Sequence, residues 1–158
     1  MKFESNRRAG QTIVEAMVGV TVIVIGLLGV LSLVGRSLAI NNDVRAQFVA
    51  TYLAAEGIEV VRNIIDANYA RGDVWDSNIN SGTYSISWDS TSLETATNQL
   101  LRFDGNQYGY AAGDATPYQR TIRVVNNGSD ISVESEVTWV ARGDNESVLL
   151  EDHFFNWR

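Results

Sequence analysis

Few side chains in this sequence could carry acid–base or nucleophilic chemistry. The chain has no cysteine, so a disulfide, a thiolate metal site and a thiol nucleophile are all excluded. The single histidine, His153, stands beside Phe154 in a stretch with strand character, where a structural or exposed role is favoured over a catalytic one. One histidine without cysteine supplies neither a zinc ligand set nor a nucleophile–base pair. We therefore expect a protein that is not an enzyme and uses no cofactor.

Binding chemistry is only weakly indicated. Two oxygen-rich stretches, 73–80 and 104–106, could hold calcium, but neither has the ligand spacing of an EF-hand, and ordinary turn chemistry is favoured. Two N-glycosylation patterns, at Asn127 and Asn145, also lie where turns are expected. The net charge of -7 repels phosphate backbones, so no nucleic-acid partner is predicted. Core or subunit packing is favoured over an adhesive surface for the aromatic residues Trp75, Trp88, Tyr108, Tyr110 and Trp157.

One carboxylate has an unusual position. Glu15 lies at the edge of a long apolar run, where a buried charge is costly unless it has a cationic or hydrogen-bonding partner. The run itself, residues 16–35, is twenty residues without a charge, and twelve of them are Leu, Ile or Val. At about 1.5 Å per residue, a helix of this length spans roughly 30 Å, which is the thickness of a bilayer's hydrocarbon core. The sequence therefore predicts a membrane-spanning helix.

The charges on either side of the run predict its orientation. Lys2, Arg7 and Arg8 precede it, whereas residues 36–158 carry nine Arg against seventeen Asp and Glu. A positive flank tends to stay in the cytoplasm, so the acidic body is expected outside. A cleaved secretory signal peptide, with Ser37-Leu38-Ala39 as its cleavage site, and a permanent signal anchor are the two alternatives.

The residues around Glu15 carry a resemblance. Gly10-Gln11-Thr12-Ile13-Val14-Glu15-Ala16-Met17 resembles the processing motif of the type IV prepilin family, in which a glycine ends a short basic leader and an apolar segment follows with Thr second and Glu fifth. Gly10, Thr12 and Glu15 match these positions. Gln11 departs from the Phe or Met that is often the first mature residue.

The resemblance implies processing and assembly. It implies cleavage between Gly10 and Gln11 by prepilin peptidase at the cytoplasmic face, followed by methylation of the new amine of Gln11. It also implies that Glu15, with Thr12 nearby, acts in assembly, since the carboxylate would pair with the Gln11 ammonium of a neighbouring subunit. The implied partners are other pilin subunits, the peptidase and an inner-membrane assembly platform. The implied location is a single-pass membrane protein with a cytoplasmic N-terminus, and afterwards an extracellular or periplasmic filament.

A weaker resemblance covers most of the chain. Residues 52–63 are similar to the second half of the long helix in PilV-like minor pilins and GspI-type pseudopilins, and the ending His153–Trp157 fits the same group loosely. The implied function is a structural subunit of a type IV pilus, as a minor pilin. The alternatives are a minor pseudopilin of a type II secretion system and, from a different class, a membrane-anchored surface binding protein.

The elements that would carry this motif can be read from periodicity. Residues 41–66 predict an amphipathic helix, with an apolar face of Val44, Phe48, Ala55, Ile58 and Ile65. Glu59 is placed to reach Arg62, and Gly57 marks a place of close backbone packing. In the following loop, Trp75 and Ile79 are expected to act as anchors.

Alternating residues predict strands at 83–88, 119–125, 131–141 and 147–155, and residues 89–117 have room for one or two more. Turn signals at 126–128 and 142–145 join the last three strands into an antiparallel meander, whose apolar face the helix would cover. The expected fold is α+β and pilin-like, a long N-terminal helix with a C-terminal antiparallel sheet on its second half. The expected parts are a leader at 1–10, an apolar helix at 11–35 and a globular domain at 36–158.

Overall fold

A computed structural model describes residues 5–156, with side chains described from Gly10 onward. One helix, α1 (Ser5–Arg71), is followed by eight strands, which confirms an α+β fold with a long N-terminal helix and a C-terminal antiparallel sheet. The chain divides into two compact units between Val44 and Arg45. The first four residues of the expected leader, which include Lys2, lie outside the described residues.

In the first unit, the described residues form the N-terminal part of α1. By length and composition this helix can cross a membrane, and none of its apolar stretch is buried. Its side chains from Ile13 to Val34 are exposed on every side of the helix. A helix that is apolar all round needs lipid or other apolar helices around it.

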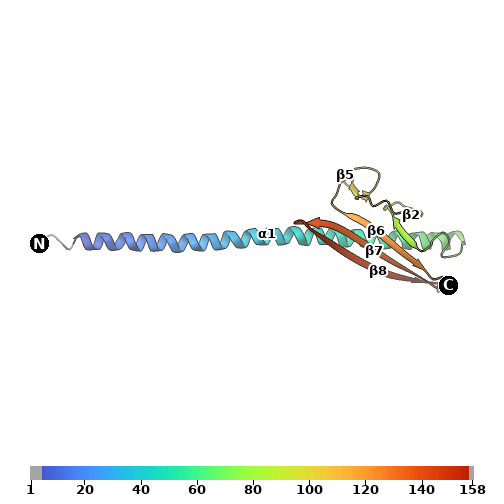
Figure 1. Ribbon diagram of the computed structural model, residues 1–158, viewed down its shortest axis with the longest axis horizontal. Coiled ribbons are helices and arrows are strands. Elements are labelled where there is room, and N and C mark those ends of the chain that lie inside the picture. The colour runs from blue at the N-terminus through green and yellow to red at the C-terminus, as the bar shows by residue number, and fades with distance from the viewer. Residues whose placement is uncertain (1–4, 157–158) are drawn as a thin grey trace. The chain divides into compact units, whose positions relative to one another are not determined.

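The second unit is built on a five-stranded antiparallel sheet in the order β2-β1-β6-β7-β8 (Figure 1). Its strands are β1 (Gly82–Ser85), β2 (Glu94–Thr95), β6 (Gln119–Asn126), β7 (Asp130–Ala141) and β8 (Asp144–Phe155). A small second sheet has the order β4-β3-β5, with β3 at Arg102–Phe103, β4 at Tyr108–Gly109 and β5 at Asp114–Ala115. Residues 89–117 thus hold four two-residue strands rather than the one or two expected.

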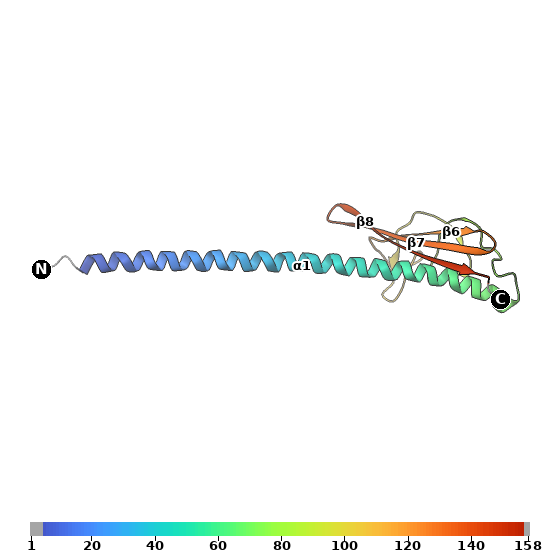
Figure 2. The ribbon, with the colours of Figure 1, turned by 90° about the horizontal axis from the view of Figure 1, so that it is seen from below.

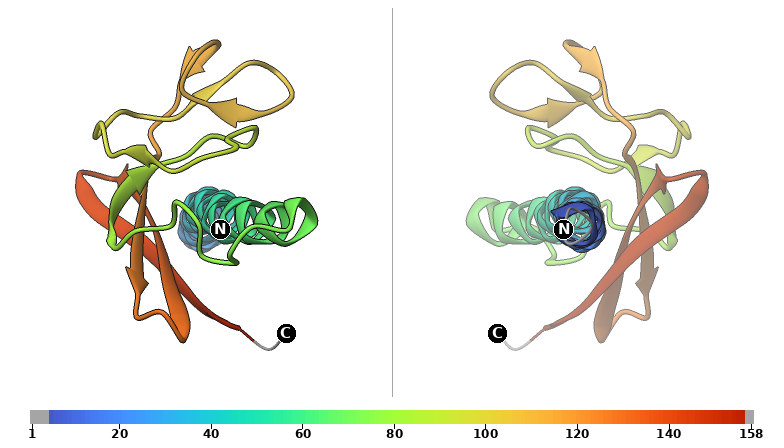
Figure 3. Two further views of the ribbon diagram at one scale, coloured as in Figure 1. Left: turned by 90° about the vertical axis from the view of Figure 1, so that its right-hand side faces the viewer. Right: turned by 90° about the vertical axis from the view of Figure 1, so that its left-hand side faces the viewer.

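The last three strands form the predicted meander. Ile131, Val133, Ser135 and Val137 of β7 are fully buried, and Trp139 nearly so, while the even-numbered residues that alternate with them are half-buried. The larger sheet lies along one side of the part of α1 that belongs to this unit (Figures 2 and 3). Each β7 residue on the buried face therefore packs toward the helix, as alternation with a period of two requires.

The helix face beneath the sheet differs from the one expected. Ile58 and Ile65 are buried, but Val44, Phe48 and Ala55 are exposed. The buried face instead runs through Ala50, Leu53, Ala54, Gly57, Ile58, Val61, Ile64 and Ile65. This stripe follows i, i+3 and i+4 spacing, and its N-terminal half contains the small residues Ala50, Ala54 and Gly57. The expected stripe placed Phe48 on the core side, but Phe48 lies outside the buried stripe and is exposed.

The turns and anchors agree with their sequence signals in most respects. Arg142 and Gly143 join β7 to β8 as a two-residue turn with φ of 53° and 94°, the positive values that a tight hairpin needs. β8 therefore begins at Asp144, three residues before the expected start at 147. Trp75 and Ile79 are buried and hold the loop after α1, as predicted. The first strand ends at Ser85 and not at Trp88, which is exposed.

Candidate functional site

The candidate processing site lies within the N-terminal turns of α1. The helix begins at Ser5, so the peptide bond between Gly10 and Gln11 is helical and both residues are exposed. A protease must draw a peptide bond out of the helix before it can attack the carbonyl carbon. Glycine weakens a helix by about 1 kcal/mol relative to alanine, so Gly10 lowers the cost of local unwinding at this bond.

The space around Gly10 shows whether the fold requires glycine at this position. A Cβ placed on Gly10 would meet no heavy atom within 4 Å, and its backbone does not have a positive φ. Neither packing nor backbone conformation in this structure therefore requires glycine. Any requirement for glycine at position 10 must come from a partner that reads the site.

The candidate assembly residues lie one turn further along the helix. Glu15 is exposed and makes no hydrogen bond or ion pair with the side chains described from Gly10 onward. Gln11 precedes it by four residues, so the two share a helix face. Thr12 is also exposed, and it does have an interaction within the chain. The structure thus brings Gln11 and Glu15 together on one face, next to the apolar stretch.

The apolar surface beside Glu15 contains a shallow groove. It is lined by Ile13, Ala16, Met17, Val20 and Thr21, with a volume of about 400 Å³. The Thr21 hydroxyl donates to the carbonyl of Met17 at 2.7 Å, so its polar group is satisfied within the helix. The surface that follows Glu15 therefore presents methyl and methylene groups, and this suits contact with lipid or with another helix of the same kind.

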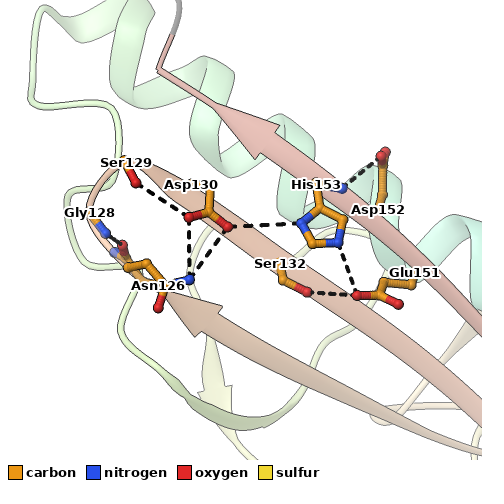
Figure 4. A network of polar contacts seen from close by, with 9 residues as sticks. Asn126, Gly128, Ser129, Asp130, Ser132, Glu151, Asp152 and His153 are labelled. Carbon is orange, nitrogen blue, oxygen red and sulfur yellow. Dashed lines mark hydrogen bonds and ion pairs between the residues drawn. The ribbon is translucent and has the colours of Figure 1, made fainter.

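His153 lies in a polar network on the outer face of the sheet (Figure 4). Its Nε2 is 3.1 Å from Glu151 Oε1, and its Nδ1 is 3.9 Å from Asp130 Oδ2. The Ser132 hydroxyl donates to the same oxygen of Glu151 at 3.1 Å, so it is directed to the carboxylate and not to the imidazole. A nucleophile–base pair needs the hydroxyl to donate to the histidine, so Ser132 and His153 do not form such a pair here.

The oxygen-rich stretches are arranged as turns. Asp104 accepts the backbone N–H groups of Asn106 and Gln107, each at 2.8 Å. The bond from Gln107, and then that from Asn106, lower the pKa of this carboxyl below its usual value. Asp73 is paired with Arg71 at 2.9 Å. Among residues 10–156, no three carboxylate or imidazole groups converge as metal ligands.

The aromatic residues divide between core and surface. Trp75 belongs to the core around Ile64 and Ile65, and Tyr108 and Tyr110 pack against a second core around Leu53 and Trp139. Trp88 is exposed, and Trp157 lies outside the described residues. The described aromatics thus contribute mainly to packing within the second unit.

Sequence reasoning missed a buried arginine. The side chain of Arg120 is fully buried, and it donates to Glu56 Oε2 at 2.7 Å and to the carbonyl oxygens of Leu53 and Ile86. Arg120 shares the inward face of β6 with Ile122 and Val124, so the period of two along that strand would have placed it in the core. It joins α1 to the sheet by charge as well as by packing.

Gly57 gives the room for this junction. A Cβ at Gly57 would lie 2.7 Å from Ile122 Cδ1 and from Ser135 Oγ, so the helix and the sheet approach each other too closely for a larger residue. The expectation of tight backbone packing at Gly57 is confirmed. The predicted Glu59–Arg62 pair is also present, at 2.8 Å.

Comparison of the chain with protein-family models, with curated proteins and with solved structures gives no match.

Proposed function

We propose that this chain is a structural subunit of a type IV pilus, made as a prepilin, cleaved between Gly10 and Gln11 and assembled through its N-terminal helix. The observation that carries the proposal is the surface of α1 in the first unit. It is an uninterrupted helix with a charge-free apolar stretch that is exposed on every side and one exposed carboxylate, Glu15, at its start.

The apolar stretch supports an anchor that can later become a filament core. Burying one Val, Leu or Ile side chain stabilises a protein by about 1.5–3 kcal/mol, and here more than ten such side chains are exposed. A bilayer removes them from water, and so does a bundle of identical helices. The same surface therefore suits both environments, which a subunit must occupy in turn.

Glu15 supports a specific register between subunits. A carboxylate among apolar side chains is costly to bury alone, and it becomes tolerable beside a cation. Cleavage after Gly10 creates an ammonium group at Gln11, one helical turn from the carboxylate. We infer that Glu15 of one subunit meets the Gln11 amine of its neighbour during assembly. The partners that this proposal requires are other pilins, prepilin peptidase and an inner-membrane assembly platform.

The test is the incorporation of a Glu15→Leu variant into filaments. In cells that carry a type IV pilus machine, sheared filaments would be separated from the cells and probed for the chain. We expect the amount in filaments to fall at least about tenfold, because an interaction of about 1.4 kcal/mol changes an equilibrium by that factor. The amount in the membrane should not change, since the variant helix is more apolar.

The matched control is Asp66→Leu, which removes an exposed carboxylate from the same helix but within the second unit. It should enter filaments at the level of the unmodified chain. Normal incorporation of Glu15→Leu would reject the proposed role of the carboxylate. Absence of the unmodified chain from filaments would reject the proposed function itself.

A further inference from the structure

One edge of the larger sheet is long and unpaired. β8 has twelve residues and pairs only with β7, whereas β2 at the opposite edge has two (Figures 1 and 3). Among residues 5–156, no segment other than β7 makes backbone hydrogen bonds to β8. Proteins usually keep edge strands short, covered or interrupted, because an open edge offers backbone donors and acceptors to another strand. The β8 edge is not short, and no other described segment pairs with its backbone.

One hydrogen bond identifies the backbone groups that point outward. The N–H of His153 donates to the carboxylate of Asp152 at 2.9 Å, so it does not take part in the ladder with β7. The register between β7 and β8 has no bulge, and backbone groups alternate along a strand. The outward N–H groups are therefore those of the odd-numbered residues from Asn145 to Phe155.

The edge is closed near its C-terminal end and open elsewhere. Asp152 covers the N–H of His153, and Arg62 holds that carboxylate in place at 2.9 Å. No hydrogen bond of this kind occurs among the described residues from Asn145 to Glu151. Seven residues thus remain available, which is the length of an ordinary strand. We call this stretch, residues 145–151, the open edge.

The side chains of the open edge define what it would accept. Leu149 is 56% exposed on the outer face, while Val148 and Leu150 are half-buried on the helix face. Glu146 and Glu151 lie at either end of this apolar centre and are both exposed. A neighbouring strand would place side chains directly opposite these residues, about 4.5–5.5 Å away, so it needs apolar residues in its middle and cations near its ends.

The charge of β8 argues against a second copy of this chain as the partner. β8 carries four carboxylates, at 144, 146, 151 and 152, and no Lys or Arg. Two such edges side by side would bring eight carboxylates together, of which only Asp152 has an arginine partner. Like charges on adjacent strands destabilise pairing, and opposite charges stabilise it. The same charges that keep copies apart would attract a basic strand.

We propose that the open edge of β8 binds an extended, basic segment of another protein, which adds as a sixth strand to the sheet. The pairing is antiparallel, because this arrangement is the more stable of the two. Lys or Arg of the segment lie opposite Glu146 and Glu151, and its apolar residues lie opposite Val148 and Leu150. The inference is independent of the proposed filament function, since it rests on the second unit alone.

The test uses the full chain, labelled with ¹⁵N in detergent micelles, and a synthetic peptide. The peptide is acetyl-Thr-Lys-Val-Thr-Val-Thr-Lys-amide, which places Lys opposite Glu151 and Glu146. We expect it to shift the amide signals of residues 145–151 and to slow hydrogen exchange at the outward N–H groups of 147, 149 and 151. A peptide with Glu in place of both Lys should bind at least about tenfold more weakly.

Two variants separate strand addition from general attraction to an acidic surface. Ser147→Pro removes an outward donor but no hydrogen bond to β7, a position where an edge strand tolerates proline. It keeps every charge of the chain and should weaken the Lys peptide at least about tenfold. Ser147→Thr keeps the donor and should bind like the unmodified chain.

Slow hydrogen exchange at the amides that bond to β7 would show that Ser147→Pro retains the fold. Glu151→Lys is a second variant, and it leaves the backbone donors of β8 unchanged. That variant should lose affinity for the Lys peptide and gain affinity for the Glu peptide. Equal binding of both peptides by the unmodified chain would overturn the proposal. So would shifts spread over the acidic surface, or binding that Ser147→Pro does not weaken.

Discussion

Arg120 is the residue at which the packing of the second unit depends on a charge. Its guanidinium has no exposed surface, and it is held by Glu56 and by two backbone carbonyls, one from α1 and one from the segment after β1. A buried cation without its counter-ion is strongly unfavourable, because the charge has been removed from water without compensation. Removing one partner of the Arg120–Glu56 pair is therefore expected to destabilise the second unit by more than the net stabilisation that the intact pair provides.

Replacing Glu56 by Gln should accordingly destabilise the second unit. Loss of one partner of a buried pair costs about 3–5 kcal/mol, and we expect about 2 kcal/mol here, because the Glu56 side chain is 33% exposed and water can compensate in part. Chemical unfolding of the full chain in micelles, followed by tryptophan fluorescence, measures the change.

The control for this prediction is Glu59→Gln, three residues after Glu56 on the same helix. Glu59 also pairs with an arginine, Arg62, but both side chains are about half exposed. Exposed pairs contribute about 0–1 kcal/mol. Equal losses for Glu56→Gln and Glu59→Gln would show that burial of Arg120 does not set the cost.

Glu15 and Arg120 differ in how clearly the sequence marks them. Glu15 is conspicuous in the sequence because it stands alone beside twenty uncharged residues. Arg120 is not conspicuous, since nine arginines are spread over residues 36–158 and burial of one depends on a partner sixty-four positions away. Only the alternation of β6 marks its inward face. Its pairing with Glu56 requires the helix and the sheet to be placed first.

At the scale of elements, two tyrosines tie the second unit together. Tyr118 donates to the carbonyl of Ala46 in α1, and Tyr110 donates to the carbonyl of Arg120 in β6, each at 3.3 Å. Burial raises the pKa of both phenols above 10.0, the value of a free tyrosine. Each phenol is therefore more easily ionised in the unfolded chain than in the folded one.

The sign of the resulting pH dependence follows from linkage. The stabilisation is complete below pH 10.0 and is lost as the pH rises through the higher folded pKa of each phenol, because the unfolded state releases its protons first. We expect the free energy of unfolding to fall above pH 10 and to fall less steeply in Tyr110→Phe and Tyr118→Phe. Urea unfolding at a series of pH values measures these slopes.

Tyr52→Phe is the matched control, since the Tyr52 ring is 65% exposed. Its slope above pH 10 should equal that of the unmodified chain. A slope that remains unchanged in both Tyr110→Phe and Tyr118→Phe would contradict the assignment of the alkaline loss to buried phenols.

Periodic elements were predictable, and irregular ones were not. β7 is predictable because Ile131, Val133 and Val137 alternate with polar residues, a period of two that is typical of a strand. The predicted apolar face of α1 is partly wrong, because the exposed residues Val44 and Phe48 are apolar and also follow helical spacing. The buried stripe uses Ala50, Ala54 and Gly57, whose small size is recognised as favourable only when the sheet is in place. The two-residue strands of 89–117 depend on tertiary pairing and have no local signal.

At the scale of the whole molecule, the chain separates two tasks. The first unit exposes its apolar side chains, and the second encloses its own in two cores between helix and sheet. In water, the exposed apolar side chains of the first unit would be unfavourable, because each one lacks the stabilisation that burial provides. By length and composition this helix can cross a membrane, and we propose that its apolar surface contacts lipid first and other subunits in a filament later.

The measurement that tests this account most directly is the intact mass of the chain after co-expression with a prepilin peptidase. We predict loss of residues 1–10 and the addition of one methyl group to the amine of Gln11. Gly10→Ala, which the fold accommodates without a contact, should remain uncleaved and equally abundant in the membrane. A full-length mass for the unmodified chain would contradict the account and favour a permanent anchor, and a cut after Ala39 would contradict it in favour of a secreted domain.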